Sequence, residues 1–118
     1  VGIPIINPDS IRMALHGQAY ITEAEPMVWS IAQYMVRALL LAGHEAVVVD
    51  ATNIRVNRRK LWVSPNDDWD LYYKHIDTPI DVCIDRAGDN PPLIEAIHRM
   101  SNSYEPVTIE EGIQELVV

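Results

Sequence analysis

The sequence lacks the features that place a protein in the secretory pathway or in a bilayer. Its single cysteine, Cys83, forms no disulfide within the chain, so a reducing compartment is expected. No apolar run approaches the ~20 residues of a membrane-spanning helix. The opening VGIPIIN carries no basic residue, unlike the start of a signal peptide. We therefore expect a cytoplasmic protein with no membrane partner.

Positive charge is also scarce. The chain has 9 Lys and Arg residues against 17 Asp and Glu residues, which gives a net charge of −8. A surface of this sign repels a phosphate backbone, which excludes broad affinity for nucleic acid. The one basic run, RVNRRK at 55–60, is either a local basic patch or a solvated helix face.

The 118 residues, 48% of them apolar and 22% charged, predict one globular domain spanning 1–118. Short apolar runs alternate with longer amphipathic runs, and Gly and Pro residues mark the ends of these runs. This pattern predicts strands at 3–6, 47–49, 71–77 and 115–118, and helices at 8–16, 26–42, 56–63, 79–88 and 91–104.

Several local signals support these elements. Asn7 is the expected N-cap of the first helix, which Gly17 ends, and Thr108 with Glu111 forms a T-x-x-E capping box. The second helix carries an apolar stripe that is expected to face inward: Val28, Ile31, Met35, Ala38, Leu39 and Ala42. The run 47–49 is valine throughout, which is typical of a strand covered on both faces. The fold class expected is α/β, with a mostly parallel sheet and helices on both faces.

Ligands of such sheets bind beyond the carboxyl ends of the strands. Asp9 and Arg12 follow the first strand and lie three residues apart on a helix, so both project to one side. A carboxylate and a guanidinium placed in this way suit a general base beside an anion clamp. Alternatively, Asp9 stabilises the helix start and pairs with Arg12.

Three further groups are candidate site residues. Asp50 ends the second strand, where a carboxylate often holds a metal ion, directly or through water. Thr52 and Asn53 either contact phosphate or cap the next helix. Arg86 lies near Gly88 in a segment expected to be mobile, and it either closes over a phosphate or is a surface arginine.

Consecutive blocks of the chain resemble one family. The blocks are INPDSIRMALHG, AEPMVWSIAQYMVRALLLAGH, VVVDATNIRVNRRKLW, IDTPIDVCIDRA and YEPVTIEEG, which together cover about 5–112. Their order and spacing are similar to those of the polynucleotide-kinase-like P-loop kinases, also called AAA-type ATP-binding predicted kinases. The resemblance implies a P-loop-kinase-like three-layer sandwich and phosphoryl transfer from ATP with Mg²⁺.

The resemblance also implies roles for the candidate residues. Asp9 would activate the acceptor hydroxyl, and Arg12 would contact a phosphate of the acceptor. Asp50 would lie beside the metal, and Thr52 with Asn53 would lie beside the phosphates. Arg86 matches the first arginine of the family's lid, and the following AGDN offers no second one. The acceptor would be a hydroxyl on a nucleic-acid end or on a small molecule.

One family feature is missing: the strand, G-x-x-x-x-G-K-[ST] loop and helix that precede the first strand. The sequence contains no Gly-Lys pair. Either it is a fragment of a longer kinase, or it is a shortened relative that dimerises or pairs other strands, or a partner donates a strand. As given, it is expected neither to bind ATP tightly nor to transfer phosphate. The alternative function is a non-catalytic binding or structural module.

Overall fold

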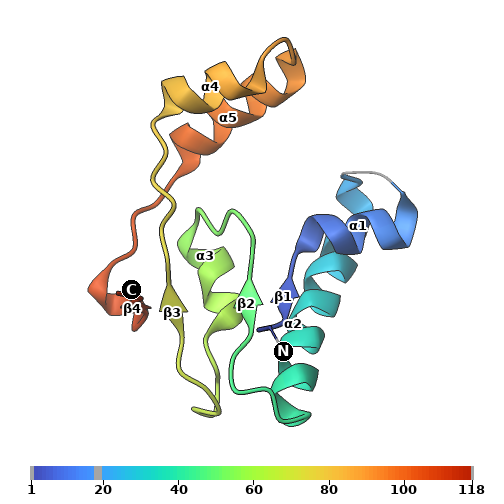
Figure 1. Ribbon diagram of the computed structural model, residues 1–118, viewed down its shortest axis with the longest axis vertical. Coiled ribbons are helices and arrows are strands. Elements are labelled where there is room, and N and C mark those ends of the chain that lie inside the picture. The colour runs from blue at the N-terminus through green and yellow to red at the C-terminus, as the bar shows by residue number, and fades with distance from the viewer. Residues whose placement is uncertain (1, 18–19, 118) are drawn as a thin grey trace. The chain divides into compact units, whose positions relative to one another are not determined.

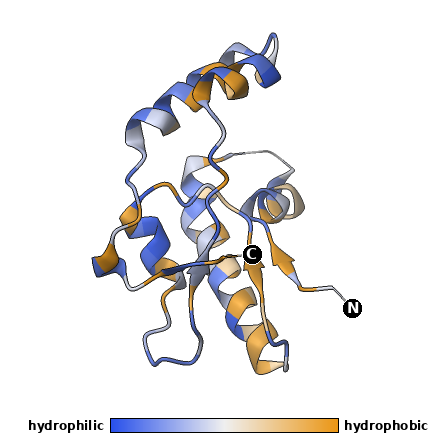
Figure 2. Cartoon of the chain, turned by 60° about the vertical axis from the view of Figure 1, so that its left-hand side comes forward, coloured by the Kyte–Doolittle hydropathy of each residue, from blue (hydrophilic) through white to orange (hydrophobic). Residues whose placement is uncertain are grey.

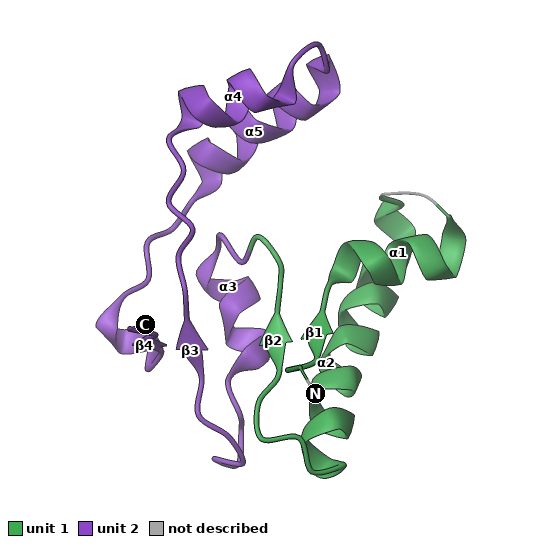
Figure 3. Ribbon diagram, in the orientation of Figure 1, with its two compact units in different colours: residues 1–52 green, residues 53–118 purple. Residues whose placement is uncertain are grey.

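The computed structural model describes residues 2–17 and 20–117 (Figure 1). The chain divides into two compact units, residues 1–52 and 53–118 (Figure 3). We describe each unit by itself and refer to them as unit 1 and unit 2. The expectation of one domain over 1–118 stays a prediction.

The described part of unit 1 contains two α-helices, and the ends of the first one follow from local sequence signals. Helix α1, Pro8–His16, begins after Asn7, whose side chain accepts hydrogen bonds from the amides of Asp9 and Ser10. It ends at Gly17, which has a φ of 66°, a conformation that favours glycine. Helix α2, Glu25–Leu41, follows a 3-10 turn. The predicted helix at 8–16 is therefore confirmed, and the one at 26–42 is confirmed within a residue at each end.

The core of unit 1 lies where α2 packs against α1 and a strand pair. Strands β1, Ile5–Ile6, and β2, Val48–Val49, pair in parallel, and Ile6 is 1% exposed. Along α2, the buried residues recur every four positions: Val28, Ala32 and Val36. Val28 was correctly predicted to face inward. Further along α2 the buried positions are Ala32 and Val36, whereas the predicted Met35 is 36% exposed.

Unit 2 is built from short elements. Its helices and strands are α3 (Val56–Arg59), β3 (Tyr72–Tyr73), α4 (Ile80–Ala87), α5 (Pro91–Ser103) and β4 (Gln114–Glu115). Strands β3 and β4 pair in parallel, and α4 packs on α5. The predicted strand at 115–118 corresponds to β4, and position 118 lies outside the described residues. None of the helices in the described ranges combines the length and apolar composition that crossing a bilayer requires.

The expected α/β sandwich, with a mostly parallel sheet covered by helices on both faces, is wrong. The structure is 53% helical, and its described residues form two separate parallel pairs, β1–β2 and β3–β4. Ile5 and Val48 lie opposite each other in the register and are 66% and 43% exposed. Both strands are hydrophobic, as their orange colour in Figure 2 shows, and the face that carries Ile5 and Val48 is open to solvent. The valine run marked an extended segment, but it did not imply a cover on both sides.

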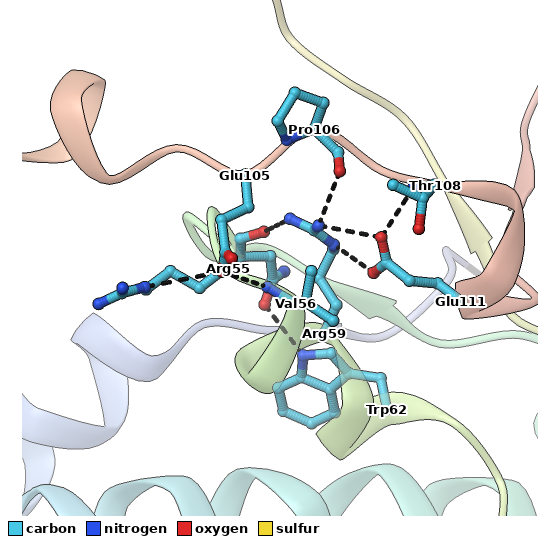
Figure 4. Close-up of polar contacts among 9 residues, drawn as sticks. Arg55, Val56, Arg59, Trp62, Glu105, Pro106, Thr108 and Glu111 are labelled. Atoms are coloured by element: carbon cyan, nitrogen blue, oxygen red, sulfur yellow. Dashed lines mark hydrogen bonds and ion pairs between the residues drawn. The ribbon is translucent and has the colours of Figure 1, made fainter.

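A buried ion pair in unit 2 joins α3 to the segment around Glu111 (Figure 4). Arg59 on α3 donates two hydrogen bonds to the Glu111 carboxylate, at 2.8 and 3.1 Å, and their side chains are 6% and 5% exposed. Arg59 also donates to the carbonyl oxygens of Asn53 and Pro106. Glu111 in turn accepts from the amide of Thr108, which confirms the predicted capping box. The pair therefore fixes the end of the chain to α3.

At least two of the four cations in the basic run 55–60 are paired with carboxylates. Arg59 is buried against Glu111, and Arg55 forms an ion pair with Glu105 at 3.7 Å. The run is therefore not a solvated helix face throughout, since Arg59 is buried, while Arg55 and Lys60 stay exposed. Arg59 contributes to the packing of unit 2, and phosphate cannot reach a side chain that is 6% exposed.

Acid should weaken unit 2 through Glu111. The hydrogen bonds from Arg59 lower the pKa of the Glu111 carboxyl below its ordinary value of 4.5. A carboxyl whose pKa is lower in the folded state adds stability above the ordinary value, and this stability is lost as pH falls through the folded-state pKa. We expect Glu111→Gln to flatten this acid loss and to cost about 3 kcal/mol at neutral pH, because Arg59 is left without its charge partner.

The measurement is hydrogen exchange of the α3 amides as a function of pH. Glu110→Gln is the matched control, because Glu110 is exposed and adjacent in sequence. An acid profile that is the same in Glu111→Gln and in the unaltered chain would contradict the role of Glu111.

Candidate functional site

The candidate site is a cleft in unit 1 at the carboxyl ends of β1 and β2. The parallel register pairs Ile6 with Val49, and the amide of Asp50 donates to the carbonyl of Ile6 at 2.9 Å. The residues that follow each strand are therefore brought to the same edge, where α1 begins. The cleft has a volume of about 80 Å³ and is lined by Pro8, Asp9, Arg12, Trp29, Asp50, Ala51 and Thr52.

Asp9 lies in the first turn of α1 with its carboxylate toward solvent. Its side chain is 77% exposed, and its Oδ1 accepts a hydrogen bond of 2.6 Å from Nη1 of Arg12. The positive end of the helix dipole favours the ionised carboxylate at this position. The amides of Asp9 and Ser10 in this turn donate to the side chain of Asn7. Asp9 is therefore oriented on one side by Arg12 and accessible from the cleft.

Arg12 is held more tightly than its neighbour. Its Nε and Nη2 donate to the two oxygens of Glu25, at 2.9 and 2.6 Å, and its side chain is 12% exposed. The rings of Tyr20 and Trp29 each lie 5.9 Å from its guanidinium carbon. The hydrogen bonds to Glu25 raise the pKa of Arg12 above its ordinary value, so the cation is permanent. This network joins the start of α1 to the start of α2.

The structure brings together four of the six predicted site residues. Asp50 and Thr52 are exposed and line the cleft with Asp9 and Arg12. A space of about 80 Å³ is small beside the ~300–1,000 Å³ of a typical ligand pocket, so it receives one group of a ligand. Within the described residues, no group of three or more His, Cys, Asp or Glu is arranged to hold a metal ion.

Asn53 and Arg86 belong to unit 2 and have other surroundings. The Asn53 side chain accepts a hydrogen bond of 3.0 Å from the indole of Trp62, and its φ is 44°. This contact gives Asn53 a packing role, and the N-cap position of α3 is Arg55, so the predicted helix cap at Asn53 is wrong. The predicted phosphate contact of Asn53 stays a prediction. Arg86 is exposed in the last turn of α4 and does not lie in the expected mobile segment between helices.

Sequence reasoning missed the acidic and aromatic residues around Arg12. Glu25 and Trp29 lie one turn apart on α2, and the Trp29 indole donates to Glu25 at 3.3 Å. The E-P-M-V-W spacing was a readable signal for that contact, because residues four apart share a helix face. The pairing of Glu25 with Arg12 spans 13 residues, and no local pattern reports it.

Comparison with known proteins adds no identification. A scan against protein families finds no match, and searches of curated proteins and of solved structures find no similar protein. The case for a function therefore depends on the geometry of the cleft and on the resemblance of the sequence blocks.

Replacing Arg12 should loosen α1 from α2. In Arg12→Lys, the ammonium keeps the charge but lacks the planar fork that binds both oxygens of Glu25 and also Asp9. We expect a loss of about 1.5–3 kcal/mol in the free energy of local unfolding, measured by hydrogen exchange of the α1 amides. Arg37→Lys, at an exposed position of α2, is the matched control. Equal protection in the two variants would show that the Arg12 network carries no stability.

Proposed function

We propose that this chain supplies the acceptor side of a phosphoryl-transfer site of the polynucleotide-kinase-like type. The observation that carries the proposal is the shared cleft of Asp9, Arg12, Asp50 and Thr52 at the ends of two parallel strands. In the resemblance of the sequence blocks, Asp9 and Arg12 contact the acceptor, while Asp50 and Thr52 lie beside the metal and the phosphates. A cytoplasmic location and an acceptor that is a small molecule or a nucleic-acid end are part of the proposal.

In this function, Asp9 is the general base. Its carboxylate is fixed by Arg12 through Oδ1 and is 77% exposed, so a hydroxyl in the cleft can hydrogen bond to it. Taking the hydroxyl proton makes the oxygen a stronger nucleophile toward phosphorus. Arg12 keeps the carboxylate in one orientation, which places the base without a search among rotamers.

Magnesium and ATP enter the proposal as the metal and the phosphoryl donor. The cleft fits hydrated Mg²⁺, because a carboxylate and a hydroxyl are oxygen ligands that this ion takes; Asp50 and Thr52 would hold it. When bound, the ion would neutralise charge on the transferring phosphate. The cleft does not fit ATP, because its volume is about 80 Å³ and Asn7 occupies the amides that would receive a phosphate.

The first test supplies a strand–P-loop–helix segment upstream of this chain and measures transfer of labelled phosphate. The acceptors are a 5′-hydroxyl oligonucleotide, nucleosides and small polyols. We expect transfer that falls by about 10²–10⁴-fold in Asp9→Asn, because the general base is lost. Asp85→Asn, at an exposed position of α4, is the control. No transfer to any acceptor, or an unchanged rate in Asp9→Asn, would count against the kinase.

A non-catalytic module that pairs with a second copy is the alternative function. It is favoured by the exposed face of β1–β2, where Ile5 and Val48 are 66% and 43% exposed. Two such faces in contact would bury apolar area that one copy leaves in water. We expect light scattering to find a dimer whose dissociation is promoted by Ile5→Lys, with Glu45→Lys as the exposed control. A monomer at every concentration tested would rule this candidate out.

A further inference from the structure

The way Arg12 is bound limits what it can offer a ligand. A guanidinium has five N–H donors, and three hydrogen bonds to Glu25 and Asp9 leave at most two for a ligand. The side chain is 12% exposed and lies near the rings of Tyr20 and Trp29. Arg12 is therefore poorly placed to clamp the phosphate that the family resemblance assigns to it.

The charge of the cleft also disfavours a phosphate. Asp9 and Asp50 line it, and Glu25 binds Arg12, the one cation among the described residues of its lining. With all of these groups ionised, three carboxylates outweigh one guanidinium. Trp29 also lines the cleft, and an indole face attracts cations. Without a bound metal ion, a phosphate would meet net repulsion in this cleft, and an ammonium group would meet net attraction.

We propose that Glu25 is a specificity-determining residue, which occupies Arg12 so that the cleft selects an amine-bearing alcohol and rejects a phosphate-bearing one. This inference rests on the proposed function, since it names the chemical class of the acceptor in that same cleft. The hydroxyl would reach Asp9, and the ammonium group would be shared by the carboxylates. Glu25 does not line the cleft itself, but it occupies Arg12 and makes the group of charges more negative.

Three small probes test the proposal on the chain as it is. Glycerol, serinol and glycerol 2-phosphate share a carbon skeleton and two primary hydroxyls and differ only in the central substituent. Each is titrated while the NMR signal of the Trp29 indole N–H is followed. We expect serinol to bind roughly fivefold more tightly than glycerol, and glycerol 2-phosphate roughly fivefold less tightly, on the scale of one charge pair near water.

The decisive variant is Glu25→Gln. Glutamine keeps the size of the side chain and one acceptor for Arg12, but it removes a negative charge and releases an Arg12 donor. We expect the affinity for glycerol 2-phosphate to rise roughly fivefold or more and the preference for serinol to shrink. A gain of binding cannot arise from a misfolded variant. Glu23→Gln removes the same charge from an exposed neighbour and should leave the order of the probes unchanged.

The outcomes separate the two levels of the proposal. Tightest binding of glycerol 2-phosphate to the unaltered chain, with or without magnesium, would overturn the inference while leaving an acceptor site for anions. An order of affinities that Glu25→Gln does not change would overturn the assignment to Glu25. If none of the probes moves the Trp29 signal, the cleft is not an acceptor site, and the proposed function fails with the inference.

Discussion

The pairing of Arg12 with both oxygens of Glu25 is the interaction on which the cleft of unit 1 depends. Strands β1 and β2 pair over two residues each, so the sheet alone gives little resistance to displacement of α1. The bidentate contact ties the second turn of α1 to the first turn of α2, and Arg12 brings Asp9 into the same network. Charged hydrogen bonds in a fixed fork are directional, so they fix an orientation that apolar contacts would leave loose.

Unit 2 contains a similar arginine–glutamate pair, but there the pair stabilises packing. Arg59 also binds both oxygens of a glutamate, but its remaining contacts are backbone carbonyls, and the Glu111 side chain is 5% exposed. No part of that cluster is accessible to a ligand. Asp9, in contrast, is 77% exposed while bound to Arg12. The exposure of the carboxylate, and not the presence of an arginine pair, separates a candidate site from a packing element.

The sequence predicted what short-range physics decides. The N-cap Asn7, the stop at Gly17 and the capping box of Thr108 act within a few residues, and each was found as expected. The layers of the fold were not predictable in this way, because a valine run specifies an extended backbone but not what covers it. The contact of Asp9 with Arg12 was readable from their spacing. Glu25, which changes what Arg12 can do, is 13 residues away and left no local trace.

A guanidinium beside a carboxylate is usually interpreted as an anion clamp next to a base, and the second carboxylate decides whether that interpretation holds. An arginine with one acidic partner keeps donors and positive charge for a ligand. An arginine with two acidic partners is more than neutralised, and the cleft takes the sign of the surplus carboxylates. Arg12 has Asp9 and Glu25, and the exposed Asp50 adds to the same side. The function of such a site therefore follows from the charge of the group as a whole.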